Sequence, residues 1–395
     1  MEISLMQLTH FKKILLSSFI ATFAFTSTPS LSFANTLGAP PVIIIKPHPV
    51  QLNAASWLLM DFETGDIITD HNMHERRAPA SLTKIMTAYI IAGELKQGTL
   101  KLDQQIKISE KASKTPGSKM FINQGSRVSV DDLLKGMIIQ SGNDATVALT
   151  EFIAGSDTNF VRLMNKTAKA LGMKDTHFAT VDGLPGDDQY TTAYDMAILA
   201  RNFIEHYPQV YKLYSEKTFM FNGIVQHNRN KLLRTFKGTD GIKTGYTKKA
   251  GYNLVASAVQ NNQRYISVIL GSPSAHVREQ ESEKLLNFGF SKFVDQLLYS
   301  KDHVISLDNT AITDAAKDAT LTVIGKDDIT KTIPKSFVNH LSQKVVLLPG
   351  LKAPIDKGQK VGTLIISAGD YEVIEVPVYA NNAIERAGFF SRWFG

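Results

Sequence analysis

Two polar residues lie three positions apart in an otherwise apolar stretch, residues 78–98, which reads APASLTKIMTAYIIAGELKQG. In a helix, side chains three positions apart project from the same face, so Ser81 and Lys84 can bring a hydroxyl and an amine side by side. Their apolar neighbours leave no wholly polar face, and we expect Lys84 to lose hydration, which lowers the pKa of an amine. A neutral lysine can accept the proton of a serine hydroxyl. The pair therefore predicts a nucleophilic serine that needs no histidine.

Two further motifs carry groups that fit the same chemistry. The chain contains a single Ser-x-x-Lys pair, but such a pair is weak evidence when it stands alone. SGN at 141–143 places a hydroxyl and a carboxamide at a break in a helical pattern, and KTG at 243–245 places an ammonium and a hydroxyl on a predicted strand. Taken separately, SGN fits a simple turn and KTG an ordinary edge strand. Taken together, in this order, the three motifs match the set found in active-serine penicillin-recognising enzymes.

The elements that must position these motifs suggest one α/β unit between residue 50 and about residue 296. Residues 55–68 read as a strand pair with a turn at Thr64 and Gly65, and strand patterns return at 241–260 and 264–272. Helical patterns fill the interval between them, and 278–293 reads as a closing helix. We expect a sheet that gathers strands from both ends of this region, covered by the helices.

Beyond residue 300 the pattern changes to short strands punctuated by Gly and Pro, with no helix between them. A small all-β domain over 299–380 is the prediction. The last stretch, 381–395, carries four aromatic residues at helical spacing near its end, which is typical of an amphipathic helix lying on a membrane surface. Arg386 falls within the apolar arc and weakens that interpretation. A tail packed on its own protein is the alternative.

The N-terminus carries the features of an export signal. Lys12 and Lys13 precede a 12-residue apolar run, and small residues end at Ala34, so we expect 1–34 to be a cleaved signal peptide rather than a spanning helix. The formal charge of the whole chain is +6, and its basic residues are scattered, so nucleic acid is not an expected partner. The chain has no cysteine, which excludes disulfides and a thiol nucleophile.

On these motifs the chain resembles the low-molecular-mass penicillin-binding proteins that are D-alanyl-D-alanine carboxypeptidases of bacterial peptidoglycan. The resemblance covers nearly everything after the signal peptide and includes DGIKTGYTKKAGYNLVASA and the β-domain phrase APIDKGQKVGTLII. It implies a penicillin-recognising, β-lactamase-like α/β domain over 35–298, the all-β domain over 299–380 as a stalk, and a membrane-anchoring tail. It also implies location at the periplasmic face of the inner membrane, stem peptides ending in D-Ala-D-Ala and β-lactams as ligands, and no metal or organic cofactor.

The resemblance assigns roles to matched positions in this chain. Ser81 corresponds to the acylated nucleophile and Lys84 to its proton acceptor, while Ser141 passes a proton to the departing D-alanine. Asn143 holds the peptide amide or the lysine. Further residues implied to bind substrate or to place positive charge beside it are Lys243, Thr244, Gly245, Tyr246 and Arg229. Many family members have histidine where this chain has Tyr246, and a main-chain donor to the oxyanion tolerates that change.

Three other readings remain open from the sequence. A class A β-lactamase needs a glutamate in an E-x-x-L-N loop, and the glutamates between the second and third motifs, Glu151, Glu205 and Glu216, do not occur in that pattern. A non-catalytic wall-binding protein is expected to have lost motif residues, all of which are present here. A cross-link endopeptidase uses the same site, and the motifs alone do not separate it from a carboxypeptidase.

Overall fold

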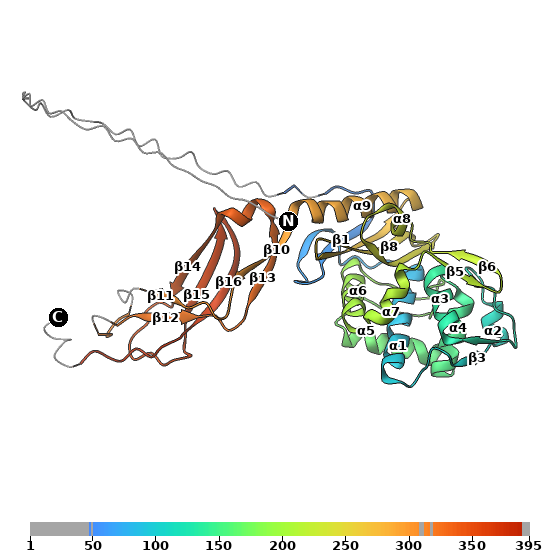
Figure 1. Cartoon of the computed structure of the whole chain (residues 1–395), viewed down its shortest axis with the longest axis horizontal. Coiled ribbons are helices and arrows are strands. Elements are labelled where there is room, and N and C mark those ends of the chain that lie inside the picture. Colours follow the sequence, from blue (N-terminus) through green and yellow to red (C-terminus); the bar gives the residue numbers. More distant parts are fainter. Residues whose placement is uncertain (1–46, 49, 308–311, 317–318, 389–395) are drawn as a thin grey trace, which may run out of the picture. The chain divides into compact units, whose positions relative to one another are not determined.

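A computed structural model describes residues 47–48, 50–307, 312–316 and 319–388. The predicted signal peptide, 1–34, lies outside the described residues. Within those described ranges, no helix has both the length and the apolar character that a bilayer crossing requires. The helices and strands are shown in Figure 1.

The α/β part is organised around one antiparallel sheet of five strands whose order differs from the chain order. N-terminal strand β1 pairs with β9, so the two ends of this part meet in the middle of the sheet, as predicted. β7, which carries the KTG motif, lies at the sheet edge. Across the sheet the strands are β2 (Ile67–His71), β1 (Ser56–Asp61), β9 (Gln263–Ser272), β8 (Gly251–Gln260) and β7 (Thr239–Thr247).

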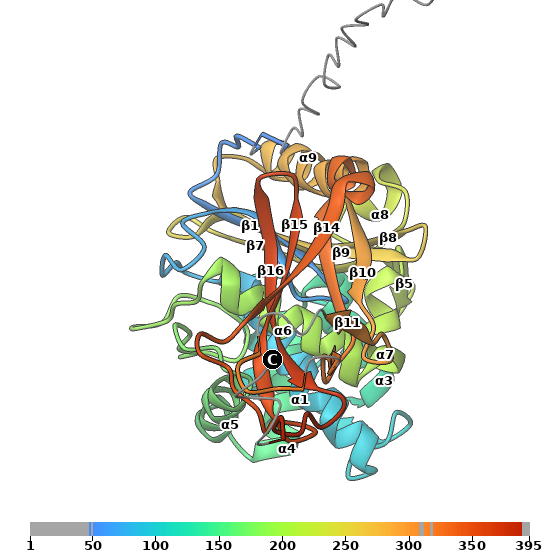
Figure 2. The ribbon, with the colours of Figure 1, turned by 90° about the vertical axis from the view of Figure 1, so that its left-hand side faces the viewer.

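Both faces of this sheet are buried, because alternate side chains of a strand point to opposite faces. In β1, Trp57 and Leu59 belong to the apolar cluster that includes Leu285 of α9 (Ala275–Lys292). The intervening residues of β1 join the larger cluster formed with the helices before β7. Figures 1 and 2 accordingly show α9 on one side of the sheet, with α1 and α6 on the other. The closing helix predicted at 278–293 is confirmed.

Several of the helices between β2 and β7 begin or end where their sequences provide caps. Ser156 and Thr192 accept hydrogen bonds from the backbone of the first turns of α5 and α6, and α1 ends at Gly98 in the left-handed conformation. These helices are α1 (Thr83–Gln97), α2 (Glu110–Lys114), α3 (Val130–Lys135), α4 (Asn143–Ala154), α5 (Asp157–Ala170), α6 (Ala193–His206), α7 (Pro208–Tyr211) and α8 (Leu232–Thr235). Two small hairpins accompany them, β3 (Gln105–Lys107) with β4 (Arg127–Ser129) and β5 (Thr218–Phe221) with β6 (Ile224–His227).

The C-terminal part is β-rich, as predicted. A five-stranded sheet has the order β11 (Ile305–Leu307), β12 (Leu321–Ile324), β16 (Tyr371–Ala380), β15 (Lys360–Ala368) and β14 (Leu341–Leu347). A second, two-stranded sheet pairs β10 (Phe293–Tyr299) with β13 (Ile329–Pro334). A 3-10 turn, 335–340, follows β13. Alternate residues of β15 and β16 point into a single apolar cluster.

The predicted C-terminal helix is not found over residues 381–388. There Ile384 and Arg386 form isolated bridges with Ile355 and Ala315, and Ile384 is part of the apolar cluster of the β domain. The predicted helix does not extend over 381–388, because Ile384 packs in the core of the β domain. Residues 389–395, which hold the four aromatic residues, lie outside the described residues, and their helix stays a prediction.

Candidate active site

Ser81 lies in a tight 3-10 turn, 80–82, directly before α1. The preceding Ala80 has a φ of 49°, a left-handed conformation that costs a residue with a β-carbon about 1–2 kcal/mol. The Thr83 hydroxyl donates to the Ala80 carbonyl at 2.8 Å, and the Asn253 side chain of β8 donates to the Ala78 carbonyl at 3.0 Å. Hydrogen bonds from α1 and from the sheet thus hold the serine in a strained turn, as is common at functional sites.

Lys84 is buried, with 1% of its surface exposed, as expected from its apolar neighbours. Its Nζ lies 3.1 Å from Ser81 Oγ, 2.7 Å from Asn143 Oδ1 and 2.5 Å from the Asp182 carbonyl oxygen. Burial lowers the pKa of Lys84 to about 8, and the nearby Arg229 adds to this effect while the Asp182 carboxylate opposes it. A neutral amine keeps two N–H donors and gains one lone pair. Lys84 can then donate to the two oxygens and accept the proton of Ser81.

The SGN motif lies at a break between two helices, as predicted. A π-helical turn, 136–140, follows α3, and Ser141 then adopts a left-handed φ of 65° before α4 begins at Asn143. The Asn143 Nδ2 donates to the Pro116 carbonyl at 2.7 Å, which leaves Oδ1 turned to Lys84. The Ser141 side chain is also buried, and among the described residues no hydrogen bond joins its hydroxyl to either active-site lysine.

The KTG motif occupies the edge strand β7 and runs past the Ser81 turn. A β-carbon on Gly245 would lie 3.0 Å from the Pro79 carbonyl oxygen and 3.2 Å from the backbone nitrogen of Leu82. The glycine therefore lets the strand approach the turn that carries the nucleophile. The resemblance implied that Gly245 binds substrate, and the structure shows the protein's own backbone beside this glycine.

Lys243 is the second buried lysine of the site, with 2% of its surface exposed. Burial lowers its pKa well below the usual value, and the positive charges of Lys84, Arg229 and Arg278 lower it further. Its Nζ donates to the Thr244 carbonyl at 3.2 Å. Several cations concentrated in a small volume create a positive potential that attracts an anionic group.

Tyr246, next in β7, has a half-exposed ring that packs against Tyr252 of β8, with 4.3 Å between ring centroids. The contact with Tyr252 holds the Tyr246 ring against β8.

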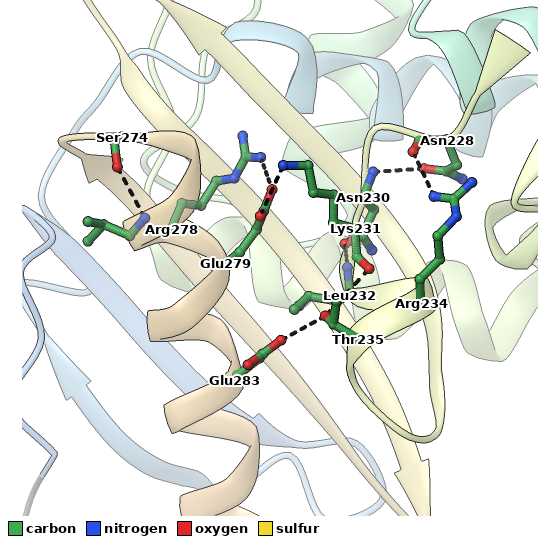
Figure 3. A network of polar contacts seen from close by, with 11 residues as sticks. Asn228, Asn230, Lys231, Leu232, Arg234, Thr235, Ser274, Arg278, Glu279 and Glu283 are labelled. Carbon is green, nitrogen blue, oxygen red and sulfur yellow. Dashed lines mark hydrogen bonds and ion pairs between the residues drawn. The ribbon is translucent and has the colours of Figure 1, made fainter.

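Figure 3 shows a polar network that anchors the loop with Asn228, Asn230 and Lys231. Arg229 lies in the same loop. Within the loop, the Asn228 side chain accepts from the backbone of Asn230, whose own amide donates to the Gly241 carbonyl at 2.9 Å. Lys231 and Thr235 then contact Glu279 and Glu283 of α9. Arg229 Nε itself donates to the Gln140 carbonyl at 2.9 Å. The network fixes a cation beside the SGN motif.

Sequence reasoning missed two residues that the fold brings to this site. Gly183 has a φ of +83°, and a β-carbon there would lie 1.9 Å from the Ala80 carbonyl oxygen, so only glycine permits this loop to contact the Ser81 turn. Arg278, at the start of α9, is buried, forms an ion pair with Glu279 and contributes positive charge at Lys243. Neither residue belongs to a motif. In the sequence, an arginine in an amphipathic helix looks like a surface residue, so the burial of Arg278 could not be predicted.

Two of the three glutamates between the second and third motifs have surroundings other than Ser81. Glu151, in α4, accepts from the Ser109 hydroxyl at 2.6 Å and pairs with Lys111. Glu205 lines a cavity of about 810 Å³ at the far end of α1 from Ser81. In the described ranges, no group of three or more His, Asp or Glu residues could hold a metal ion.

A serine whose hydroxyl contacts a buried lysine of lowered pKa, placed between an SGN turn and a KTG edge strand, defines the active-serine class of penicillin-recognising proteins. Comparison with known proteins is consistent with this class. The family model for D-alanyl-D-alanine carboxypeptidase matches residues 44–274, and that for the C-terminal domain of penicillin-binding protein 5 matches residues 293–386. The chain therefore belongs to the D-alanyl-D-alanine carboxypeptidase family of serine peptidases.

Relatives of the whole chain support this assignment. The D-alanyl-D-alanine carboxypeptidase DacD of Salmonella typhimurium is 39% identical over 90% of this chain and 92% of its own length. DacC of Escherichia coli is 40% identical over 87% of this chain and 90% of its own length. The crystal structure of DacD from Francisella tularensis has a TM-score of 0.87 and 43% identity, covering 90% of this chain and 99% of that one. Penicillin-binding protein 5 of Haemophilus influenzae has a TM-score of 0.74 and 39% identity, covering 86% and 100%.

Proposed function

We propose that Ser81 is the nucleophile with which this serine-type D-alanyl-D-alanine carboxypeptidase removes the terminal D-alanine from peptidoglycan stem pentapeptides. Ser81 Oγ gives its proton to Lys84 and forms a bond to the carbonyl carbon of the penultimate D-alanine. The C–N bond breaks, and the amine of the terminal D-alanine takes a proton through Ser141. Water then hydrolyses the acyl-enzyme. The 3.1 Å contact between Lys84 Nζ and Ser81 Oγ carries this proposal.

The remaining site residues act on the substrate's charges. The terminal carboxylate binds Thr244 and Arg229, and Lys243 adds positive charge, which explains removal of a C-terminal residue only. The oxyanion accepts hydrogen bonds from the backbone N–H groups of Ser81 and Tyr246. Asn143 orients Lys84, as its 2.7 Å contact with the amine supports.

β-Lactams acylate the same serine, because their strained amide and carboxylate resemble the D-Ala-D-Ala terminus. A solved relative, penicillin-binding protein D2 of Listeria monocytogenes with bound ampicillin, has a TM-score of 0.57 and 30% identity, covering 62% of this chain and 100% of that one. Hydrolysis of the acyl-enzyme is slow here, since the glutamate that orients water in class A β-lactamases has no counterpart in the SGN–KTG interval.

The domain organisation follows from the same function. Peptidoglycan lies outside the cytoplasm, so 1–34 serves as the signal for export and 35–298 is the catalytic domain. The β domain, 299–380, raises the active site from the membrane, and residues 389–395 attach the protein to the periplasmic face of the inner membrane. Trimming of pentapeptides limits the donors for cross-linking and so influences cell shape.

A fluorescent fusion ending at residue 388 tests the membrane attachment. If this fusion stays membrane-bound like the full chain, attachment through 389–395 is refuted.

The deciding experiment is release of free D-alanine from a soluble peptide ending in Lys-D-Ala-D-Ala, with Ser81→Ala as the comparison. We expect release by the parent and a loss of at least about 10³-fold in the variant, as for removal of other catalytic nucleophiles. No release by the parent, despite labelling of Ser81 by penicillin, would favour the endopeptidase alternative and direct the assay to cross-linked peptides.

A further inference from the structure

Asn253, in β8, connects the sheet to the chain segment that leads into the nucleophile. Its side chain is fully buried. The Nδ2 group donates to the Ala78 carbonyl at 3.0 Å and to the Pro79 carbonyl at 3.2 Å, and Oδ1 accepts from the backbone of Gly271 at 2.8 Å. Among the described residues, the two donations are the only hydrogen bonds between 78–82 and the five-stranded sheet. One side-chain amide therefore attaches the nucleophile turn to the sheet.

The register of the sheet places this amide directly across from the KTG motif. Asn253 pairs with Gly245 of β7, so the two residues face the same side of the sheet. A β-carbon on Gly245 would lie 3.0 Å from the Pro79 carbonyl oxygen, which is an oxygen that Asn253 also contacts. The Pro79 carbonyl therefore packs against the backbone of β7 and bonds to the side chain of β8.

The two backbone N–H groups assigned to the oxyanion lie next to this contact. In the proposed function, on which this inference rests, the donors are Ser81 and Tyr246. Ser81 comes two residues after Pro79, and Tyr246 directly follows Gly245. The first donor belongs to the turn that Asn253 holds, and the second belongs to the strand that pairs with β8. The distance between the donors thus depends on how closely the turn is held to the sheet.

The other hydrogen bonds near the nucleophile leave this distance unrestrained. The Thr83 hydroxyl bonds to the Ala80 carbonyl, and the backbone of Leu82 donates to the Pro79 carbonyl at 3.3 Å, so both bonds lie within the turn and the start of α1. The φ of 49° at Ala80 is strained, and strain persists only where surrounding contacts impose it. Without the amide, we expect the turn to shift away from the sheet.

We propose that Asn253 is a positioning residue that sets the geometry of the oxyanion hole by holding the Ser81 turn at a fixed distance from β7. It touches neither the substrate nor the reacting atoms. Negative charge develops on the carbonyl oxygen only during attack. Misplaced donors therefore slow bond formation and leave substrate binding nearly unchanged.

An ester substrate and its sulfur analogue test this role. The ester is an N-acetylated peptide ending in Lys-D-Ala-D-lactate, and the thionoester carries sulfur in place of the scissile carbonyl oxygen. Sulfur is a weak hydrogen-bond acceptor, so the thionoester gains little from the oxyanion hole. The readouts are kcat and KM for D-lactate release, normalised to active sites titrated with labelled penicillin. A poorly folded site or a weakened base would slow both substrates equally.

Asn253→Ala is expected to lower kcat for the ester by about 30- to 100-fold and to change its KM by less than about threefold. The thionoester is expected to slow by less than about threefold, so the ester-to-thionoester ratio falls by at least about tenfold. The pH midpoint of ester hydrolysis stays at the parent value, because asparagine is uncharged. Asn253→Asp is the second variant, since it keeps the size of the side chain and removes the donor, and the same fall in the ratio is expected.

Asn382 offers a matched control in the β part. Its Oδ1 accepts from the backbone of Thr322 at 2.8 Å, and its Nδ2 donates to the Thr320 carbonyl at 2.9 Å. It therefore also joins backbone segments through one side-chain amide. Asn382→Ala is expected to keep both rates within about twofold of the parent, because distant sites act independently.

Each outcome bears on the role of Asn253 separately from the proposed function. Equal slowing of both substrates in the Asn253 variants overturns the positioning role and leaves a structural one. An unchanged kcat for the ester in these variants, or an equal fall of the ratio in Asn382→Ala, overturns it as well. Equal rates for ester and thionoester in the parent overturn the oxyanion assignment and the role of Asn253 together. No release from the ester by the parent overturns the proposed function itself.

Discussion

The α/β part and the C-terminal β part fill their interiors with different chemistry. Among the described residues, all buried charged or polar side chains lie before residue 293. They include Lys84 and Lys243. The core of the β part is apolar, apart from the hydroxyl of Tyr299, which donates to the His303 carbonyl at 2.6 Å. Burying a cation is costly, so a chain that does so gains something other than stability. The difference separates a part built for chemistry from a part built for structure.

Backbone geometry differs between the two parts as well. Around Ser81, residues 80, 141 and 183 have a left-handed φ, and a β-carbon on Gly183 would lie 1.9 Å from the Ala80 carbonyl oxygen. In the β part, β14, β15 and β16 pair in regular antiparallel register with small irregularities in β15. Strain of this kind persists only where surrounding contacts determine it, which is the case at the nucleophile.

Four tests examine whether the two parts differ in this way. They are given from the largest to the smallest expected effect on the rate of acylation by penicillin.

Removing the buried amine has the largest effect. Lys84→Met is expected to slow acylation by at least about 10³-fold, because the proton of Ser81 then lacks its acceptor. Stopped-flow acylation by a chromogenic β-lactam measures this rate. Lys96→Met, an exposed lysine of the same helix, is the control and is expected to react like the parent. Acylation of Lys84→Met within tenfold of the parent would end the serine–lysine assignment.

The second-largest effect on acylation is expected from disturbing the contact between the Gly183 loop and the Ser81 turn. Gly183→Ala is expected to slow acylation about 10- to 100-fold, since its β-carbon would collide with the Ala80 carbonyl. Gly155→Ala separates this collision from the cost of a left-handed φ, because Gly155 has a φ of +74° and no atom within 4 Å of the added carbon. Equal acylation rates in the two variants would show that the loop does not position the serine.

The pH dependence of acylation is the third test. The pKa of Lys84 falls from 10.5 to about 8, and only the neutral amine accepts a proton, so the rate rises with pH and levels off above about pH 8. Below that pH we expect about a tenfold change per unit. Arg229→Gln is expected to move the midpoint to higher pH, because the arginine charge lowers the pKa of Lys84. A flat profile from pH 6 to 9 would contradict a titrating base.

A change in the β part is expected to affect acylation least. Leu364 in β15 is fully buried, and Leu364→Ala should destabilise this part by about 2–5 kcal/mol through the lost contacts and the cavity. Thermal unfolding measures the stability, and acylation at 20 °C is expected to change less than twofold. A parallel loss of acylation by the folded variant would show that the β part supports the active site as well.

The sequence alone predicted much of this fold, because the relevant patterns are local. The helix after Ser81, the break at Ser141 and the strand carrying Lys243 follow from periodicity and from breaking residues within a few positions. The helix predicted over 381–395 is not found at 381–388, where Ile384 packs in the core of the β part. Periodicity reports which side chains are apolar and says nothing of which partner buries them.

Tertiary structure decided what depends on contacts between distant segments. The sequence determined the groups that can do chemistry, Ser81, Lys84, Asn143 and Lys243, since their types and order are written in three short motifs. Only the fold brought the Asp182 carbonyl to Lys84 and the Gly183 loop to the Ser81 turn. The physical reason is range: a motif encodes a few neighbouring side chains, whereas burial, a lowered pKa and a pocket arise where loops far apart in the chain exclude water together.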